Sequence, residues 1–394
     1  MVIAMTRDEV CDLFNSNPCL TLPIIVETGS SVQGELEKRW DSFFEFLHRT
    51  EALYSCIEPA EYSREKITAA FKNYYAGDFG KASENLFDIV KTLIDKYRCK
   101  NLITDISSLY IGNESKNWFR ARTGTFYPFS KDDMKHIPTD KREFIGSNRY
   151  SSNGIPCLYL ANSILTCWEE LNRPSLDSFW VSRFWPVKEI RVLNLSVTGY
   201  EIINAQQYIR TVSENKDAYD QVVVDFFSTW VLQSACSVAV RSKANRLFRE
   251  EYLIPQLLMQ NVKRFDANAI MYFSTKTPLL IGDKEIATNF QTSASWIAKA
   301  IALPVFETTG DRFSAQINED FAVSLPINIG LYQNHLMPQE PPFISDENWS
   351  RISAPAYITL APAIYGKTVF YRCETELFQS CYKLSEKEVT KPNA

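Results

Sequence analysis

Apolar and polar residues alternate with a helical period through the first hundred residues. In residues 35–49, and again in residues 82–98, the apolar side chains fall on one stripe of a helix. The segment between them, residues 63–78, is also helical in composition and reaches Gly77. The pattern therefore predicts a small helical N-terminal module over residues 1–105.

The pattern changes from residue 106 onward, where short runs of β-branched and aromatic residues replace the helical stripes. Four such runs predict strands at residues 157–161, 190–196, 269–275 and 367–373. Helical patterns at residues 162–171 and 217–240 separate some of them. Strands mixed with irregular segments and few helices predict an α+β fold, with a mixed-sheet domain over residues 106–394 and a helical insertion near residues 200–250.

One stretch, residues 222–240, is nearly long and apolar enough to span a membrane. Asp225 lies inside it with several hydroxyl and amide side chains, and an ionisable residue in hydrocarbon is costly. We therefore expect a buried helix of a water-soluble domain and no membrane partner. The chain reaches acids by Asp8 without an uninterrupted apolar run, so no signal peptide is expected.

The amino-acid composition and net charge exclude several classes of function. Hydrophobic residues make up 45% and charged residues 23% of the chain, which is ordinary for a globular protein with a normal core. The net charge of −5 argues against a broad nucleic-acid-binding face. Nine cysteines without a Cys-x-x-Cys pair predict free thiols in a reducing cytoplasm. Three widely separated histidines predict no zinc site, and neither nucleotide-binding glycine loop is present.

The stretch NRYSSNGIPCLYLANSILTCWEEL, residues 148–171, combines a polar turn, an apolar strand and the start of a helix. Asn162 or Ser163 is the expected helix cap, and the helix then carries Glu169 and Glu170 within two turns. Because the strand end and the helix start share one edge of the sheet, we expect an arginine, a tyrosine and a glutamate of this stretch to converge on one cleft.

Each of these residues alone has a simpler explanation. An arginine–glutamate pair at a sheet edge is more often a structural ion pair, and a tyrosine in an apolar strand is more often a core residue. Either glutamate could equally lie on the solvated face of its helix. It is the ordered set of motifs that favours a functional site.

Four blocks in a fixed order resemble the RES domain, a family named for its arginine, glutamate and serine. The blocks are WFRART (118–123), the stretch 148–171, EEYLIPQLLMQ (250–260) and NAIMYFS (268–274). The helical N-terminal segment is similar to the extra module found on longer, HEPN-associated members. Together these likenesses cover most of the chain, and the region after residue 280 matches only loosely.

The family's functional residues have counterparts in this chain. In chain order, they are Arg120, Arg149, Tyr150, Tyr159, Glu170, Gln256 and Ser274. Glu169, one residue before the matched glutamate, is the alternative acid. The turn departs from the family pattern, since Ser147 and Asn148 stand where many members have two glycines.

The resemblance implies a fold like that of ADP-ribosyltransferases and a site that consumes NAD as a substrate. Glu170 would stabilise the positive charge that develops on the ribose, and Arg120 and Arg149 would bind the pyrophosphate. A tyrosine face would hold the nicotinamide ring, and a serine hydroxyl or glutamine amide would fix the ribose or the carboxamide. Neither a metal nor a prosthetic group is implied.

We expect a toxin-like NAD glycohydrolase that releases nicotinamide and ADP-ribose, in a toxin–antitoxin or anti-phage setting. The family includes toxins that destroy NAD by hydrolysis or phosphorolysis, and some members modify proteins. NAD phosphorylase and protein ADP-ribosyltransferase therefore stay open as variants of the same chemistry that differ in the acceptor. Smaller members pair with helix-turn-helix antitoxins, so an antitoxin or regulatory protein is the expected partner, and a homo-oligomer stays open.

Two other functions are alternatives. A module that binds a nucleotide and senses it without turnover would keep the cleft and could lose Glu170. An RNase formed by the helical segment lacks its motif, because Arg39 and His48 stand too far apart in the sequence.

Overall fold

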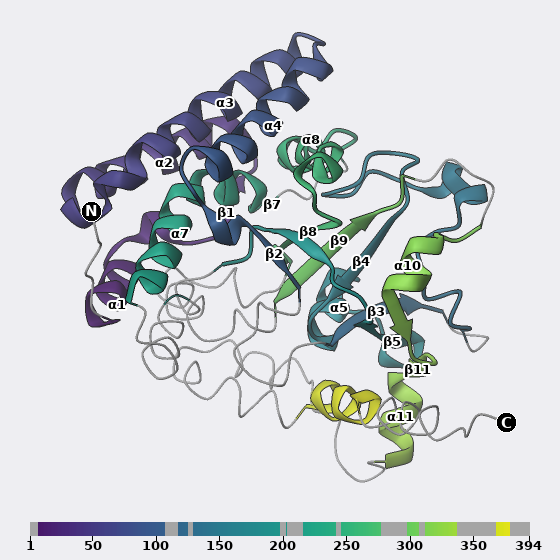
Figure 1. The fold of residues 1–394 in the computed structure, drawn as a ribbon. Coiled ribbons are helices and arrows are strands. Elements are labelled where there is room, and N and C mark those ends of the chain that lie inside the picture. Colours follow the sequence, from purple (N-terminus) through teal and green to yellow (C-terminus); the bar gives the residue numbers. More distant parts are fainter. Residues whose placement is uncertain are drawn as a thin grey trace, which may run out of the picture.

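The computed structural model describes residues 7–106, 117–124, 129–197, 202, 216–241, 246–276, 298–306, 312–336 and 368–378. Helices from the first hundred residues lie to one side of a long mixed sheet (Figure 1). The α+β class predicted from the sequence is confirmed.

Four helices form the N-terminal segment: α1 (Arg7–Ser16), α2 (Val32–Arg49), α3 (Ile57–Tyr75) and α4 (Phe79–Asp95). The Ser31 side chain caps α2 by accepting a hydrogen bond from the backbone of Gly34, and Asp78 caps α4 in the same way. The turn between α3 and α4 contains Gly77 with a φ of 82°, a conformation that suits a residue without Cβ. The three predicted helices are confirmed, and each begins earlier than predicted.

Helix α7 (Lys216–Cys236) packs among the N-terminal helices although it is far from them in sequence. Trp230 stacks on Phe43 with ring centroids 4.3 Å apart, and Ser234 accepts a hydrogen bond from the Trp40 indole at 2.9 Å. Asp225, the acid inside the apolar stretch, is buried and accepts hydrogen bonds from the backbone and side chain of Asn101. Among the described helices, none combines the length and apolar character that crossing a bilayer requires.

The sheet has nine strands among the described residues, in the order β10–β5–β3–β4–β9–β8–β6–β2, with β11 also paired to β5. Their bounds are β2 (Ile103–Asp105), β3 (Trp118–Thr123), β4 (Cys157–Ala161), β5 (Phe179–Pro186), β6 (Arg191–Asn194), β8 (Ala269–Phe273), β9 (Lys299–Pro304), β10 (Phe321–Val323) and β11 (Ile327–Asn328). All pairings are antiparallel except that of β6 with β8, so the sheet is mixed. A separate parallel ribbon pairs β1 (Ile24–Glu27) with β7 (Val238–Arg241).

Three of the four predicted strands are confirmed as β4, β6 and β8. The fourth prediction is wrong, because residues 369–378 form a helix where residues 367–373 were expected to be a strand. Its apolar residues recur at helical spacing and are buried in a cluster that includes Phe179 of β5; they are Val369, Phe370, Cys373 and Leu377. Arg183 donates hydrogen bonds to the carbonyl groups of the last two helical residues, where a cation stabilises a helix end.

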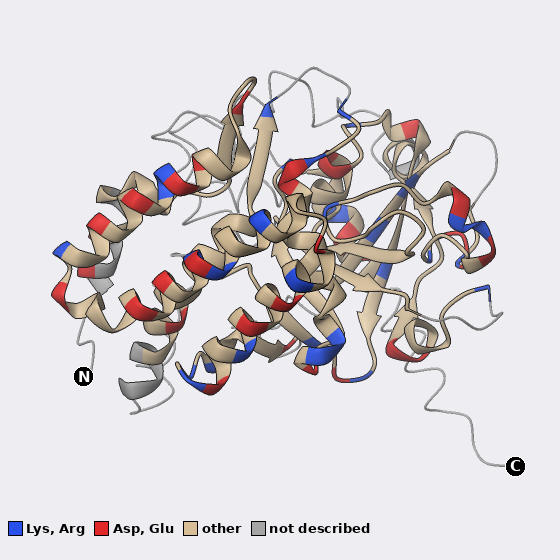
Figure 2. Ribbon diagram, turned by 90° about the horizontal axis from the view of Figure 1, so that it is seen from above, with Lys and Arg blue, Asp and Glu red and all other residues tan. Residues whose placement is uncertain are grey.

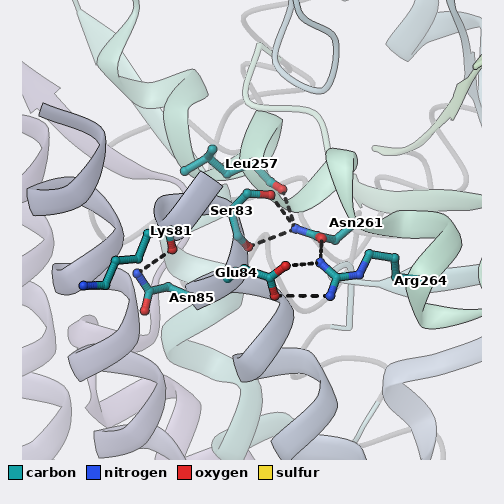
Figure 3. Close-up of polar contacts among 7 residues, drawn as sticks. All are labelled: Lys81, Ser83, Glu84, Asn85, Leu257, Asn261 and Arg264. Atoms are coloured by element: carbon teal, nitrogen blue, oxygen red, sulfur yellow. Dashed lines mark hydrogen bonds and ion pairs between the residues drawn. The ribbon is translucent and has the colours of Figure 1, made fainter. Parts of the chain in front are cut away.

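Helix α8 (Leu253–Gln260) joins the helical segment to the sheet (Figure 3). The Asn261 amide, just after this helix, donates to the carbonyl and hydroxyl oxygens of Ser83 on α4 at 3.0 and 2.9 Å. Arg264 forms two contacts with Glu84, at 2.8 and 3.2 Å. One core cluster contains Leu86 of α4, Leu257 of α8 and Ile270 of β8, so the helical segment and the sheet share a core.

We predict that Asn261→Ala lowers the free energy of unfolding by about 1–3 kcal/mol, because the amide is buried and its partners on α4 lose a donor. Chemical denaturation followed by circular dichroism measures this change. Lys91→Ala, which removes an exposed pair within α4, is the matched control with an expected effect below about 0.5 kcal/mol. Equal effects of the two variants would contradict the prediction.

Candidate active site

The ends of β4 and β8 lie at the same edge of the sheet, on either side of β9, which pairs antiparallel with both strands. Helix α5 (Ile164–Glu170) begins directly after β4, and Ser274 directly follows β8. Ser163 caps α5 by accepting a hydrogen bond from the backbone of Thr166 at 3.1 Å, which settles the choice between the two expected caps. The sheet therefore brings α5 next to a segment more than a hundred residues away in sequence.

Glu170 and Ser274 are in direct contact at this edge. The Ser274 hydroxyl donates a hydrogen bond of 2.5 Å to Glu170 Oε1. Lys276 Nζ donates to the Glu170 carbonyl at 2.7 Å and lies 3.9 Å from Oε2. Ser274 is fully buried, whereas the Glu170 side chain keeps 34% of its surface exposed. The carboxylate is therefore held by a buried hydroxyl on one side and is accessible to solvent on another.

Glu169 has a different environment from its neighbour. Both of its oxygens accept hydrogen bonds from Arg173 Nε, at 3.1 and 3.0 Å, and the residue is buried. Burial raises the pKa of Glu169 to about 7, while Arg173 acts in the opposite direction. Because its oxygens are occupied within α5 and the following turn, the geometry favours Glu170 over Glu169 as the acid that meets a ligand.

Arg149 contacts Thr275, the residue that follows Ser274. Its Nη2 donates to the Thr275 hydroxyl at 2.7 Å and to the Val238 carbonyl at 2.9 Å, and its Nη1 donates to the Cys236 carbonyl at 3.3 Å. The guanidinium also stacks over the Tyr252 ring, 5.2 Å from its centroid. Thr275 directly follows Ser274, so Arg149 binds one residue away from the partner of Glu170.

Tyr150 and Tyr159 brace the turn that carries Arg149. The Tyr159 hydroxyl accepts a hydrogen bond from the Tyr150 backbone at 3.2 Å and lies 3.0 Å from the Ser151 hydroxyl. The Tyr150 ring is fully buried and lies 4.5 Å from the Tyr272 ring. Burial raises the pKa of both predicted tyrosines well above the ordinary value, so both phenols stay protonated.

Gln256 of α8 holds the same turn from the other side. Its amide nitrogen donates to the Ser147 hydroxyl at 2.8 Å, the Asn148 carbonyl at 2.8 Å and the Ser151 carbonyl at 3.2 Å. Asn148 and Ser151 also pair with each other through a β-bridge. The Gln256 amide is thus engaged with the turn, and the serine and asparagine that stand in place of two glycines provide two of its acceptors.

Arg120 is placed differently from Arg149. Its Nη1 donates to the Tyr159 carbonyl at 3.2 Å, and its Nε has no hydrogen-bond partner among the described residues. Burial, followed by the charge of Arg122, lowers the pKa of Arg120 to about 10. Cys167 of α5 lies within electrostatic range of both Arg120 and Glu170, yet the structure records no direct contact between this arginine and either Arg149 or Glu170.

Glu170 and Ser274 are thus in direct contact, and Arg149 binds the residue after Ser274. Tyr150, Tyr159 and Gln256 form or contact the turn that carries Arg149. Sequence reasoning missed Tyr272 and Thr275. The Tyr272 phenol has its pKa raised by burial first and then by the charge of Glu170, with Arg149 acting in the opposite direction, so it lies near both groups. The only sequence signal for it is the YFS run that ends in Ser274.

Metal and thiol chemistry depend on how the histidines, acids and cysteines of the described part of the chain are placed. No group of three or more potential metal ligands gathers there. The cysteines described are all free, and six of the seven are buried. Burial raises the pKa of Cys157, which is near the site, to about 12, so this thiol is a poor nucleophile at neutral pH.

The fold and site define an α+β protein with a serine-oriented glutamate and an arginine at one edge of a mixed sheet. No protein-family model matches the chain. It is 30% identical over 323 residues to "Putative toxin YopC" of Bacillus subtilis (strain 168), a match that covers 80% of this chain and 70% of that protein. The chain therefore belongs to the YopC family.

Among solved structures, the chain also matches one chain of the crystal structure of the M. tuberculosis MbcT–MbcA toxin–antitoxin complex. The match has 12% sequence identity and covers 56% of this chain and 88% of that chain. The TM-score of the match is 0.27.

We predict that Glu169 makes the protein less stable as pH rises from about 4.5 to 7. Its pKa is raised in the folded state, so in this window the unfolded chain loses the proton while the folded chain keeps it, and stability falls with rising pH. The Glu169→Gln variant is expected to lose this pH dependence. The resulting difference in the free energy of unfolding across the window is about 3 kcal/mol at most. Melting temperatures of both proteins across the pH window test this, and parallel curves would contradict it.

Proposed function

We propose that this protein is a toxin-like NAD glycohydrolase, which adds water across the nicotinamide–ribose bond of NAD to give nicotinamide, ADP-ribose and a proton. The observation that carries the proposal is the 2.5 Å hydrogen bond from Ser274 to Glu170 beside Arg149. Three residues matched by the resemblance to RES domains meet at this point from three separate parts of the chain.

Glu170 has the geometry that the chemical step needs. When the N-glycosidic bond breaks, nicotinamide leaves as a neutral group and positive charge develops on the ribose. A carboxylate fixed beside that carbon stabilises the charge, and one already oriented by a hydrogen bond has no reorganisation to make. Ser274 supplies the orientation through Oε1, while Oε2, which accepts no hydrogen bond among the described residues and lies 3.9 Å from Lys276 Nζ, would face the substrate sugar or orient the attacking water.

Arg149 suits the pyrophosphate of NAD. A guanidinium has five N–H donors, and the hydrogen bonds from Arg149 to two carbonyls and one hydroxyl use three of them. These contacts and the Tyr252 ring fix the side chain, so its remaining donors are held in place for phosphate oxygens. Arg120 would assist from the strand that carries it, because its buried charge has no carboxylate partner among the described residues.

The toxin role rests on the relative rather than on geometry. YopC is named as a putative toxin, and this chain belongs to its family. An enzyme that consumes NAD without restraint would poison its own cell, so we propose an antitoxin or other regulatory protein as a partner. Phosphate or a protein side chain in place of water would give the phosphorylase or ADP-ribosyltransferase variant of the same step.

We predict that Glu170→Gln lowers the rate of nicotinamide release from NAD by about 10²-fold or more, because the amide cannot stabilise the positive charge on the sugar. Purified protein is incubated with NAD, and products are separated and weighed by mass spectrometry with and without phosphate. Glu65→Gln, which changes an exposed glutamate of α3, is the control with an unchanged rate. ADP-ribose identifies water as the acceptor, and a phosphorylated ADP-ribose identifies phosphate.

Two outcomes would contradict this proposal. Wild-type protein that binds NAD without releasing nicotinamide would instead support a nucleotide sensor. Loss of activity in Glu169→Gln with full activity in Glu170→Gln would move the function to the other acid.

We predict that Ser274→Ala lowers kcat by about tenfold while KM changes less, because the hydroxyl orients the carboxylate and does not itself hold the substrate. Ser274→Thr, which keeps the hydroxyl, is expected to recover part of the lost rate. A change confined to KM would show that the serine binds the substrate directly.

A further inference from the structure

A hollow of about 510 Å³ lies apart from the proposed active site, beside the end of β3. Arg122 of β3 forms part of its wall, and the 3-10 turn Thr139–Phe144 and the segment around Arg312 form others. None of the seven residues matched to the RES family lines it. Its volume is within the roughly 300–1,000 Å³ typical of small-molecule sites.

The wall of this hollow has more cations than free carboxylates. Arg122, Lys141 and Arg312 face it. Of its two acids, Asp132 is paired with Lys135 at 2.6 Å, and Asp133 accepts hydrogen bonds from the backbone and hydroxyl of Ser130. Asp133 lies within electrostatic range of Arg122 and Arg312, and Arg312 Nε lies 3.9 Å from Asp140, so the three cations are compensated only in part.

This local excess of positive charge is not a property of the whole surface. The chain carries a net charge of −5. Figure 2 shows basic and acidic residues interspersed along the described helices and loops. A cationic hollow in an acidic protein therefore needs its own explanation.

Arg122 is the strongest evidence for a missing anion. Its Nη2 donates to the Lys135 carbonyl at 3.0 Å, and its buried Nε has no partner among the described residues. No carboxylate in that part of the chain lies within ion-pair distance of it; burial lowers its pKa, and the more distant charge of Asp133 acts in the opposite direction. A buried cation without an ion pair is unfavourable, and an anion in the hollow would compensate its charge.

Another part of the wall is held by the contacts of His136. His136 is fully buried, with Nδ1 2.7 Å from the Ile137 carbonyl and Nε2 accepting a hydrogen bond from the Ser314 backbone at 2.9 Å. Its ring packs edge-on against Phe313, which also lines the hollow. Phe144, 71% exposed, adds a second aromatic ring that a flat base could cover.

We propose that this hollow binds a phosphate-bearing ligand of nucleotide size, with Arg122, Lys141 and Arg312 on the phosphates and the two phenylalanine rings beside the base. Guanidinium groups match phosphate oxygens in pairs, and a lysine adds a point charge. The site is separate from Glu170 and its function does not depend on cleavage of NAD.

Calorimetric titration of ADP into the full-length protein and into its Arg149→Gln variant tests the site, because the variant removes the arginine proposed to bind the pyrophosphate of NAD and does not change a residue of the hollow. The expected result is binding that weakens with added salt and is absent for adenosine, which has the base but no phosphate. The double variant Lys141→Gln/Arg312→Gln should weaken ADP binding by roughly tenfold or more, because two charge-assisted contacts are lost. Both residues are exposed, so the fold should survive the change.

The control removes the same charge elsewhere. Lys72→Gln/Lys81→Gln changes two exposed lysines of the helical segment that do not line the hollow, and its ADP affinity should equal that of the wild type. An ADP affinity within twofold of the wild type in Lys141→Gln/Arg312→Gln, or equal binding of adenosine and ADP, would overturn the proposal. Neither result bears on nicotinamide release, so the two proposals fail separately.

Discussion

The position of β9 between β4 and β8 is the constraint on which the candidate active site depends. Ala302 of β9 pairs with Tyr159 on one side and with Ile270 on the other, so the two outer strands run level with each other. Their chain directions agree, and both end at the same edge. A slip of one residue in β8 would turn Ser274 to the opposite face of the sheet and break its hydrogen bond to Glu170.

Helix α8 and the residue that follows it contact both the N-terminal helices and the turn at this site. Gln256 on the helix holds the turn that carries Arg149, and Asn261 just beyond it is held by Ser83 of α4. The core runs without a break from the helical segment into the sheet, and one short helix connects α4 to the turn that carries Arg149.

The local sequence pattern predicted the helices and strands better than it predicted the contacts between elements that are distant in sequence. The helical stripes and the apolar run of β4 were identified because each element carries its own periodicity. The helix at residues 369–378 was mistaken for a strand because a short apolar run fits both, and burial on one side decides between them. The contact between Arg149 and Thr275 joins positions 126 residues apart and has no signal in local sequence. The cationic hollow was missed for the same reason.

The two adjacent glutamates show how the fold divides one motif into two tasks. Successive residues of a helix point about 100° apart, so Glu169 and Glu170 face different surroundings. The chain leaves α5 through Asn172 and Arg173, both with φ near 60°, a conformation that is unfavourable for residues with a Cβ. The paired oxygens of Glu169 and the ring of Trp168 hold Arg173 in that turn. With the turn fixed, the Glu170 carbonyl accepts a hydrogen bond from Lys276 and its carboxylate accepts one from Ser274, so the buried acid helps to fix the position of the half-buried one.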